Sequence, residues 1–158
     1  MRVFPQPSEA DVRRLLAAAQ LPAADLSAAQ LAHFFGCGSP DRPQGVGGVE
    51  MHGSDALLRS LAVDETLRGR GCGKALVATL EHHAREQGAR RIYLLTTTAA
   101  RFFEGLGYRA VARDAAPERI RATPEFSTLC PASAVFMTKY LDSPAARAAR
   151  STTGRRQT

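Results

Sequence analysis

A glycine-rich run between an apolar segment and an amphipathic segment constrains the fold of this chain more than any other feature. The run, RGRGCGKA at residues 68–75, follows the apolar stretch 57–63 and precedes a segment with helical periodicity. Glycines at alternate positions let the backbone approach an anion closely, and the start of a helix directs unpaired N–H groups to the same place. The sequence therefore predicts a strand, a pyrophosphate-binding loop and a helix, in that order.

Two other phosphate-binding motifs do not fit this run. The dinucleotide fingerprint needs G-x-G-x-x-G, whereas the spacing here is G-x-G-x-G, with no acidic residue at the end of a following strand. The P-loop needs a hydroxyl after Gly73-Lys74, and Ala75 has none to bind Mg²⁺. The pattern that remains is [R/Q]-x-x-G-x-[G/A], which Arg68, Gly71 and Gly73 fill.

Periodicity and turn residues predict the other elements. Ser8 is expected to cap the first helix, with Asp11 three residues on as in a capping box. The segment 36–48, which contains Pro40 and Pro43, is expected to hold a short strand and a turn. Strands are expected at 2–6, 46–52, 56–63, 91–96, 108–113 and 134–141, and further helices at 23–33, 75–87, 99–106 and 117–122.

Length and composition indicate one soluble globular domain. The 158 residues are 44% hydrophobic and 23% charged, and no apolar run approaches the roughly 18–20 residues of a membrane span. The first residues contain no apolar region of the kind that signal peptides carry, so a cytoplasmic protein is expected. We expect the domain to cover residues 1–141. Residues 142–158, with four arginines and one aspartate, are expected to form a disordered basic tail.

The distribution of charge and the spacing of cysteines and histidines argue against nucleic-acid-binding proteins and against metalloproteins. Much of the net charge of +6 lies in the tail, and basic residues are not interleaved with aromatic ones, so nucleic-acid binding is not expected. The three cysteines, Cys37, Cys72 and Cys130, are odd in number and scattered, which suits reduced thiols. The four histidines have no zinc-ligand spacing with them, so no metal site is expected.

The order of strand, R-x-x-G-x-G loop, helix, strand and a short helix ending in Gly107-Tyr108 resembles the core of the GNAT N-acetyltransferases. The resemblance implies an α/β (α+β) fold with a mixed, mostly antiparallel sheet flanked by helices. Its two central parallel strands would splay apart to admit acetyl-CoA as co-substrate. The implied partner is a small-molecule amine acceptor, and a homodimer stays open.

The resemblance also implies which residues contact acetyl-CoA. Backbone groups of Leu61 and Val63 would bond the pantetheine amides as an added strand does, while a nearby N–H polarises the thioester carbonyl. A threonine hydroxyl would face the sulfur, and Phe103 would pack against the cofactor. The implied cofactor-binding residues are Leu61, Ala62, Val63, Arg68, Gly69, Arg70, Gly71, Cys72, Gly73, Lys74, Thr97, Thr98 and Phe103, and Thr98 is also a candidate N-cap for the helix at 99–106.

Two positions depart from the usual GNAT pattern. Where family members often carry a glutamate before the glycine loop, this chain has Leu57 and Leu58, so Glu50 on the preceding strand is the candidate base for deprotonating the amine. Where the family commonly has a tyrosine that protonates the leaving thiolate, this chain has Phe103. A thiol of reference pKa about 8.5 can leave without that help.

The acceptor is suggested by a narrower likeness. Residues 58–63, 94–98 and 120–134 resemble the ArsN-type arsenic-resistance N-acetyltransferases, relatives of the phosphinothricin acetyltransferases. That likeness implies a zwitterionic amino acid acceptor containing arsenic or phosphorus, and hence detoxification. Arg59 and Thr96 are the candidate acceptor-binding residues, because a desolvated arginine needs an anionic partner. Cys130 is interpreted as a core residue. The alternatives are a general small-amine or protein N-terminal acetyltransferase, and a non-catalytic CoA-binding module.

Overall fold

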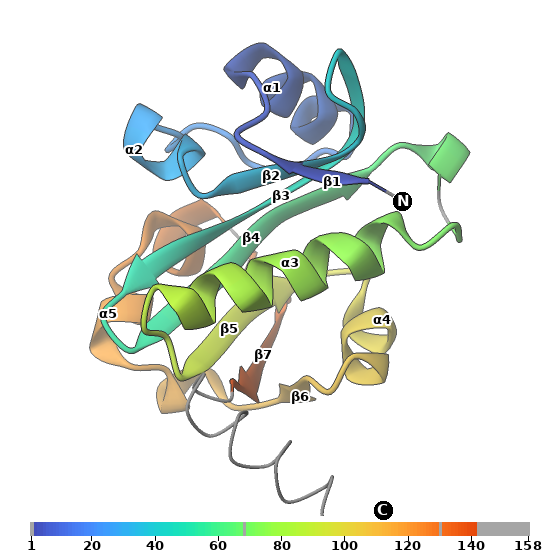
Figure 1. Cartoon of the computed structure of the whole chain (residues 1–158). Helices are drawn as coiled ribbons and strands as arrows, with labels where there is room; N and C mark the ends of the chain where they lie inside the picture. The colour runs from blue at the N-terminus through green and yellow to red at the C-terminus, as the bar shows by residue number, and fades with distance from the viewer. Residues whose placement is uncertain (1, 68, 130, 142–158) are drawn as a thin grey trace, which may run out of the picture.

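The computed structural model describes residues 2–67, 69–129 and 131–141, whose strands form one seven-stranded sheet (Figure 1). Neighbouring strands are antiparallel except β4 and β5, which are parallel. This confirms the predicted mixed, mostly antiparallel sheet. Its spatial order is β1 (Val3–Pro5), β2 (Phe34–Ser39), β3 (Arg42–His52), β4 (Asp55–Val63), β5 (Arg91–Thr96), β7 (Val135–Tyr140) and β6 (Arg109–Ala110).

Helices cover both faces of the sheet. On β3, Val49 belongs to the buried cluster that includes α3, whereas Val46 packs with residues of α1. Because side chains alternate between the faces of a strand, α3 and α1 lie on opposite faces. The α-helices are α1 (Glu9–Ala18), α2 (Ala28–Leu31), α3 (Cys72–Glu86), α4 (Ala100–Gly105) and α5 (Glu118–Arg121), with short helical turns at Glu65–Leu67, Arg113–Ala115 and Glu125–Leu129.

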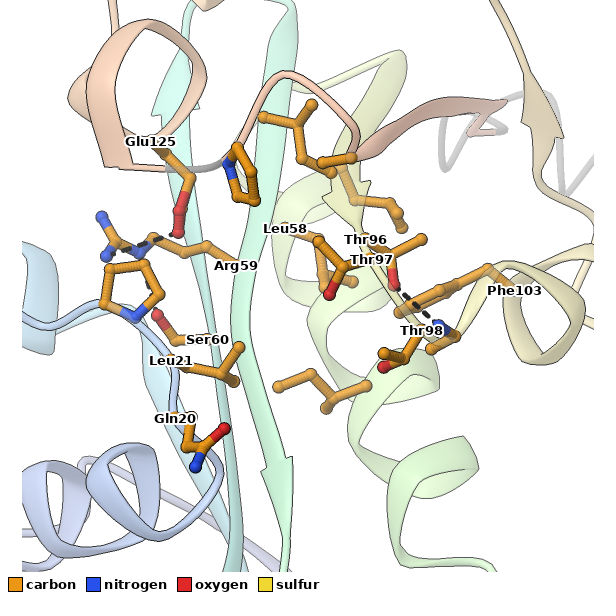
Figure 2. A pocket seen from close by; sticks show the side chains of 17 residues that line it. Gln20, Leu21, Leu58, Arg59, Ser60, Thr96, Thr97, Thr98, Phe103 and Glu125 are labelled. Carbon is orange, nitrogen blue, oxygen red and sulfur yellow. Dashed lines mark hydrogen bonds and ion pairs between the residues drawn. The ribbon is translucent and has the colours of Figure 1, made fainter.

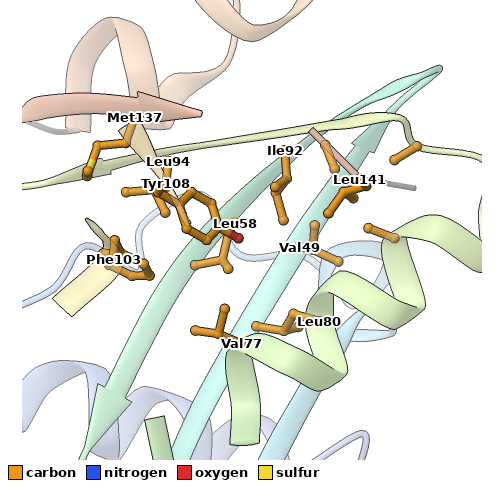
Figure 3. Close-up of a cluster of buried hydrophobic side chains, with 13 residues drawn as sticks. Val49, Leu58, Val77, Leu80, Ile92, Leu94, Phe103, Tyr108, Met137 and Leu141 are labelled. Carbon is orange, nitrogen blue, oxygen red and sulfur yellow. The ribbon is translucent and has the colours of Figure 1, made fainter. Parts of the chain in front are cut away.

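The largest core cluster fixes α3 across the sheet (Figure 3). Val77 and Leu80 on the buried side of α3 pack with Val49, Leu58 and residues of β5. Each fully buried large aliphatic side chain stabilises the fold by about 1.5–3 kcal/mol relative to exposure. At the start of α3, Cys72 and Leu76 pack with Leu61 and Val63, which holds the first turn of the helix beside the end of β4.

The hairpin of β2 and β3 extends further than the sequence predicts. The structure has a complete strand β2, and β3 begins at Arg42 rather than at residue 46. A Cβ at Gly36 would lie 2.4 Å from the Phe4 ring, and one at Gly48 would lie 2.3 Å from the Phe34 ring. Cross-strand packing therefore requires these glycines. Because glycine has a low strand propensity, the sequence pattern does not reveal that they lie in strands.

Several predicted bounds are corrected. The expected helix 23–33 is wrong apart from α2, which starts at a capping box formed by Ser27 and Gln30. The expected strand 108–113 is reduced to β6, and α3 begins at Cys72 rather than at residue 75. Ser8 caps α1, as predicted, by accepting a hydrogen bond from the Asp11 N–H.

Two sequence predictions concern parts of the chain outside the described residues. Cys130 and the tail 142–158 both lie there, so the core role of Cys130 and the expected disorder of the tail stay predictions. Within the described residues, no helix is long and apolar enough to cross a membrane.

Candidate active site

A cavity opens where the two parallel strands separate. The register pairs Asp55 with Arg91 and ends with Leu57 opposite Tyr93, and no further pair between β4 and β5 occurs among the described residues. Beyond this point both strands line a space of about 270 Å³, here called the β4–β5 cavity (Figure 2). Its lining comes from the segment after α1, from both strands, and from α4 and the turn at Glu125–Leu129. The predicted splay is therefore present in the sheet.

A β-bulge marks the β4 side of the cavity. Val46 pairs with Ala62 and Gly48 with Arg59, so two residues of β4 oppose one residue of β3. Ser60 takes φ +59°, in the left-handed region that non-glycine residues avoid. Such strain is of the order of 1–3 kcal/mol. The bulge redirects the backbone of β4 just before Leu61–Val63, and the ladder with β3 resumes at Ala62 and Val63 in a shifted register.

A second hollow continues from the cavity along the end of β4. It is lined by Leu61, Ala62, Val63 and Thr98 together with Ala19 and Leu21, and it shares Leu21, Leu61 and Thr98 with the β4–β5 cavity. We call it the adjoining groove. The predicted cofactor strand and one of the predicted threonines thus lie on a single path that leads out of the cavity.

The glycine loop lies at the start of α3. Gly71 is the N-cap with φ +87°, and Gly69 has φ +79°. A Cβ built at either glycine would meet no atom within 4 Å. The two glycines are therefore required by backbone conformation, and the space beside them is open to a ligand. The first N–H groups of α3 point out of the helix start, where an anion is stabilised. Arg68 lies outside the described residues.

Cys72 contributes only its main chain to this loop. Its thiol is buried beside Cys37 and Leu76, in space that Gly45 provides, because a Cβ at Gly45 would lie 2.5 Å from Cys72 Sγ. Burial, with the neighbouring Cys37 thiol, raises the pKa of Cys72 to about 12, so the thiol stays protonated at neutral pH.

Threonines form the β5 side of the cavity. Thr96, the last residue of β5, accepts a hydrogen bond from the Ala99 N–H at 3.0 Å. The prediction that Thr98 caps the following helix is therefore wrong, because the N-cap is Ala99 and the side chain that bonds its N–H is Thr96. Thr97 and Thr98 line the cavity.

Phe103 projects from α4 into the same wall (Figure 2). It is buried and packs edge-on against Tyr108, with ring centroids 5.5 Å apart, and Tyr108 in turn donates a 2.8 Å hydrogen bond to Glu81 of α3. This packing places a hydrocarbon ring, which cannot donate a proton, at the position where the GNAT resemblance would imply a tyrosine.

Arg59 is the centre of a buried ion-pair network on the opposite wall. Its guanidinium donates to both carboxylate oxygens of Asp25, with Nη2 2.7 Å from Oδ1, and to Glu50 Oε2 at 2.8 Å. Its Nε donates to Ser60 Oγ at 3.0 Å, and Nη2 lies 3.7 Å from Glu125 Oε1. The side chain is 0% exposed. The predicted anionic partners of Arg59 are thus carboxylates of the protein itself.

Glu50 joins this network from β3. Its Oε1 lies 3.1 Å from His52 Nε2, and its Oε2 accepts from Arg59. Burial alone would raise the pKa of Glu50, but hydrogen bonds from His52 and Arg59 outweigh burial and hold the pKa below its ordinary value. Glu50 is therefore ionised at neutral pH, as a base must be. It does not line the β4–β5 cavity, whereas Arg59 and Glu125 do.

Sequence reasoning missed three charged or titratable residues of this site. Asp25 lies between α1 and α2, His52 ends β3, and Glu125 begins the turn after α5. Asp25 and Glu125 are far from Arg59 along the chain, which hides their contacts with it, although the mid-strand position of Arg59 indicated that anionic partners exist. His52 contacts Glu50 rather than Arg59. Among the described residues, no group of three or more histidine, cysteine or acidic side chains could hold a metal ion.

Comparison with known proteins gives a family for this arrangement. The model of the acetyltransferase (GNAT) family matches residues 6–108. An uncharacterized N-acetyltransferase of Chlorobaculum tepidum is 35% identical over 65 residues, which are 41% of this chain and 41% of that protein. N-alpha-acetyltransferase 80 of Mus musculus is 42% identical over 53 residues, 34% of this chain and 17% of the mouse protein. The matches thus span less than half of these curated relatives.

A solved structure shares the fold. Rv2747 of Mycobacterium tuberculosis, in complex with coenzyme A, superposes with a TM-score of 0.74 at 20% sequence identity, over 90% of this chain and 100% of that one. At this identity the likeness concerns the fold alone.

Proposed function

This chain belongs to the acetyltransferase (GNAT) family, and from that premise we propose that it transfers an acetyl group from acetyl-CoA to the amino group of a small acceptor. The observation that carries the proposal is the continuity of three features. The β4–β5 cavity opens into the adjoining groove, and the groove follows the end of β4, after which the glycine loop leads into α3.

The residues present fit acetyl-CoA. Main-chain N–H groups of residues 71–74 would hold the pyrophosphate, because the open space at Gly69 and Gly71 lets it approach the backbone. Arg70 and Lys74 would add positive charge at this end. The free edge of Leu61–Val63 would bind the pantetheine arm as an added strand does. Thr97, Thr98 and Phe103 would line the side of the cofactor that faces β5.

Bound acetyl-CoA supplies a thioester: the amine nitrogen forms a bond to its carbonyl carbon, the C–S bond breaks, and coenzyme A leaves as a thiolate. The protein must remove one proton from the attacking amine. We propose that Glu50 receives it. Because Glu50 does not line the cavity, the proton would reach it through water, and His52, partly exposed beside Glu50, would connect that carboxylate to solvent.

Two classes of acceptor arise from the sequence. The ArsN-type resemblance suggests a zwitterionic amino acid that contains arsenic or phosphorus, with detoxification as the outcome, and places Arg59 and Thr96 at the acceptor. The alternative is a general small amine or a protein N-terminus. The two differ in whether the acceptor must carry a carboxylate.

The test is acetyl-CoA-dependent release of free thiol across a panel of amines of both classes. We expect turnover with at least one amine. We expect Glu50→Gln to lower kcat/KM by roughly 10²–10⁴-fold at neutral pH. The loss should shrink at high pH, where the amine deprotonates unaided.

Two controls separate the outcomes of this test. Glu118→Gln, an exposed glutamate on α5, should behave as the wild type. Binding of acetyl-CoA without thiol release for any amine would identify a non-catalytic CoA-binding module. Unchanged kcat/KM in Glu50→Gln would remove Glu50 from the proton path.

A further inference from the structure

We infer that Gln20 selects the acceptor, by hydrogen bonding to an uncharged amide group that the acceptor carries besides its amine. The inference rests on the proposed function, because it concerns the acceptor of the β4–β5 cavity. The observation that carries it is a glutamine side chain that lines this cavity from a backbone position suited to glycine.

Gln20 follows α1 in a left-handed conformation. Its N–H donates to Ala17 O at 3.1 Å, and the Leu21 N–H donates to Leu16 O at 2.9 Å. These two hydrogen bonds form a Schellman motif, in which the residue with positive φ is usually glycine and sometimes asparagine. Gln20 has φ +58°. A residue with a Cβ is strained in this conformation, so the helix end by itself would be more stable with glycine.

The strain coincides with the cavity. Among the described residues, three non-glycine residues have positive φ, namely Gln6, Gln20 and Ser60. Gln20 and Ser60 line the cavity, and Figure 2 shows them with Leu21 on one side of it and Thr98 on the other. Backbone strain is concentrated at sites where the structure holds a side chain in position for a ligand. Ser60 belongs to the bulge of β4. Gln20 belongs to no strand, so what glutamine adds at this position is a side chain on the cavity wall.

The side-chain amide of Gln20 is available to a ligand. The residue is exposed, and in the part of the chain that the structure describes this amide has no hydrogen-bond partner. It is uncharged and offers both N–H donors and a carbonyl acceptor. The lining residues that follow it, Leu21 and Pro22, are apolar. A few polar groups in a largely apolar cavity fix the orientation of a ligand, and Gln20 is placed to do this for the acceptor.

An amide group of the acceptor would match both parts of the Gln20 amide. Its carbonyl would accept from Nε2, and its N–H would donate to Oε1. A carboxylate can only accept, and a hydrocarbon group can do neither, so each would leave part of the Gln20 amide unpaired. Of the two acceptor classes, the inference therefore favours the general small amines, in the form of a small amine that also carries an amide.

The experiment measures kcat/KM by thiol release for 3-aminopropanamide, 4-aminobutanamide and 5-aminopentanamide. Each is compared with the amine of the same shape in which an isopropyl group replaces the carboxamide, such as 4-methylpentan-1-amine for 4-aminobutanamide. Gln20→Met keeps the length of the side chain and its Cβ but removes the amide. We expect this variant to shift the ratio of kcat/KM values toward the isopropyl amine, by about tenfold for at least one length.

Glycine variants separate recognition from structure. Gln20→Gly relieves the strain and should raise Tm by about 2–4 °C, while it lowers kcat/KM for the best amide by about tenfold. Gln6→Gly is the matched control, because Gln6 has φ +54°, is exposed and does not line the cavity. It should raise Tm as well but leave kcat/KM unchanged. A purely structural role for Gln20 would not move stability and activity in opposite directions.

An unchanged ratio in Gln20→Met at every length would overturn the inference, as would wild-type kcat/KM in Gln20→Gly. Failure of the proposed function has a different signature, since no amine would then release thiol with the wild-type protein. In that case, calorimetric binding of the same amides to the protein saturated with coenzyme A still decides the role of Gln20. Weaker binding to Gln20→Met than to the wild type would support it, and equal binding would contradict it.

Discussion

Asp25 and Arg59, 34 positions apart in the sequence, form a two-point ion pair that fastens the segment after α1 to β4 at the wall of the β4–β5 cavity. Gln20, Leu21 and Pro22 of the same segment line the cavity. The ion pair therefore does two things: it neutralises part of a buried charge cluster, and it positions one side of the space into which an acceptor would enter.

Replacing Arg59 should lower the free energy of unfolding more than replacing one of its carboxylate partners does. Arg59→Met leaves three buried carboxylates without their guanidinium and should lower the free energy of unfolding by about 3–5 kcal/mol. Asp25→Asn keeps the cation with its other partners and should lower it less. Arg13→Met, which breaks an exposed pair with Glu9, should change it by at most about 0.5 kcal/mol. Urea denaturation measures all three, and a loss in Arg59→Met no greater than in Arg13→Met would contradict the network.

Ser60 offers a test of the bulge that isolates backbone strain. Ser60→Ala and Ser60→Gly both remove the hydroxyl that accepts from Arg59 Nε, so they differ mainly in tolerance of φ +59°. Glycine adopts this conformation freely and alanine does not. We expect Ser60→Gly to be the more stable variant by about 1 kcal/mol in urea denaturation. Equal stability of the two would show that β4 does not take this conformation at residue 60.

Stability should fall in acid through the Arg59 network. The pKa values of Asp25 and Glu50 are below their ordinary values in the folded protein, so the unfolded chain binds more protons in the acidic range. Their stabilisation is complete above the unfolded pKa values of about 4 and is lost as the pH falls through the folded ones. The urea midpoint should drop steeply below about pH 4.5, and less steeply in Glu50→Gln, because that variant has one titrating carboxylate fewer. Identical acid profiles for wild type and variant would exclude Glu50 from this linkage.

Local patterns predicted the central part of the fold well. The glycine run, the apolar strand before it and the helix after it depend on neighbours in sequence, and each occurs where expected, with α3 starting slightly earlier. Only a short strand was expected within residues 36–48, and the start of β2 at Phe34 was missed, because Gly36 is set by its contact with the Phe4 ring from another strand. A contact of that kind leaves no local pattern to find.

In the candidate site, too, features that depend on neighbours in sequence could be predicted, and contacts between distant segments could not. The residues whose proposed role depends on the main chain, such as Gly71 and Leu61, could be placed from the motif and the strand that precedes it. Arg59 was singled out because an arginine between apolar residues needs a partner, but the partners Asp25 and Glu125 come from distant segments. Glu50 was assigned to the neighbouring strand, and only the structure shows that its carboxylate meets Arg59 and His52.

The most direct test of the central claim is the affinity for acetyl-CoA, measured by calorimetry, in two matched variants. Gly71→Asn and Gly88→Asn each place a side chain at positive φ in open space, at the start and just beyond the end of α3. Asparagine tolerates this conformation, so both variants should fold. If the pyrophosphate lies on the loop before α3, Gly71→Asn should weaken binding by about tenfold or more, because its side chain occupies the space of the ligand. Gly88→Asn should bind as the wild type does. Equal affinities in the two variants would contradict the account.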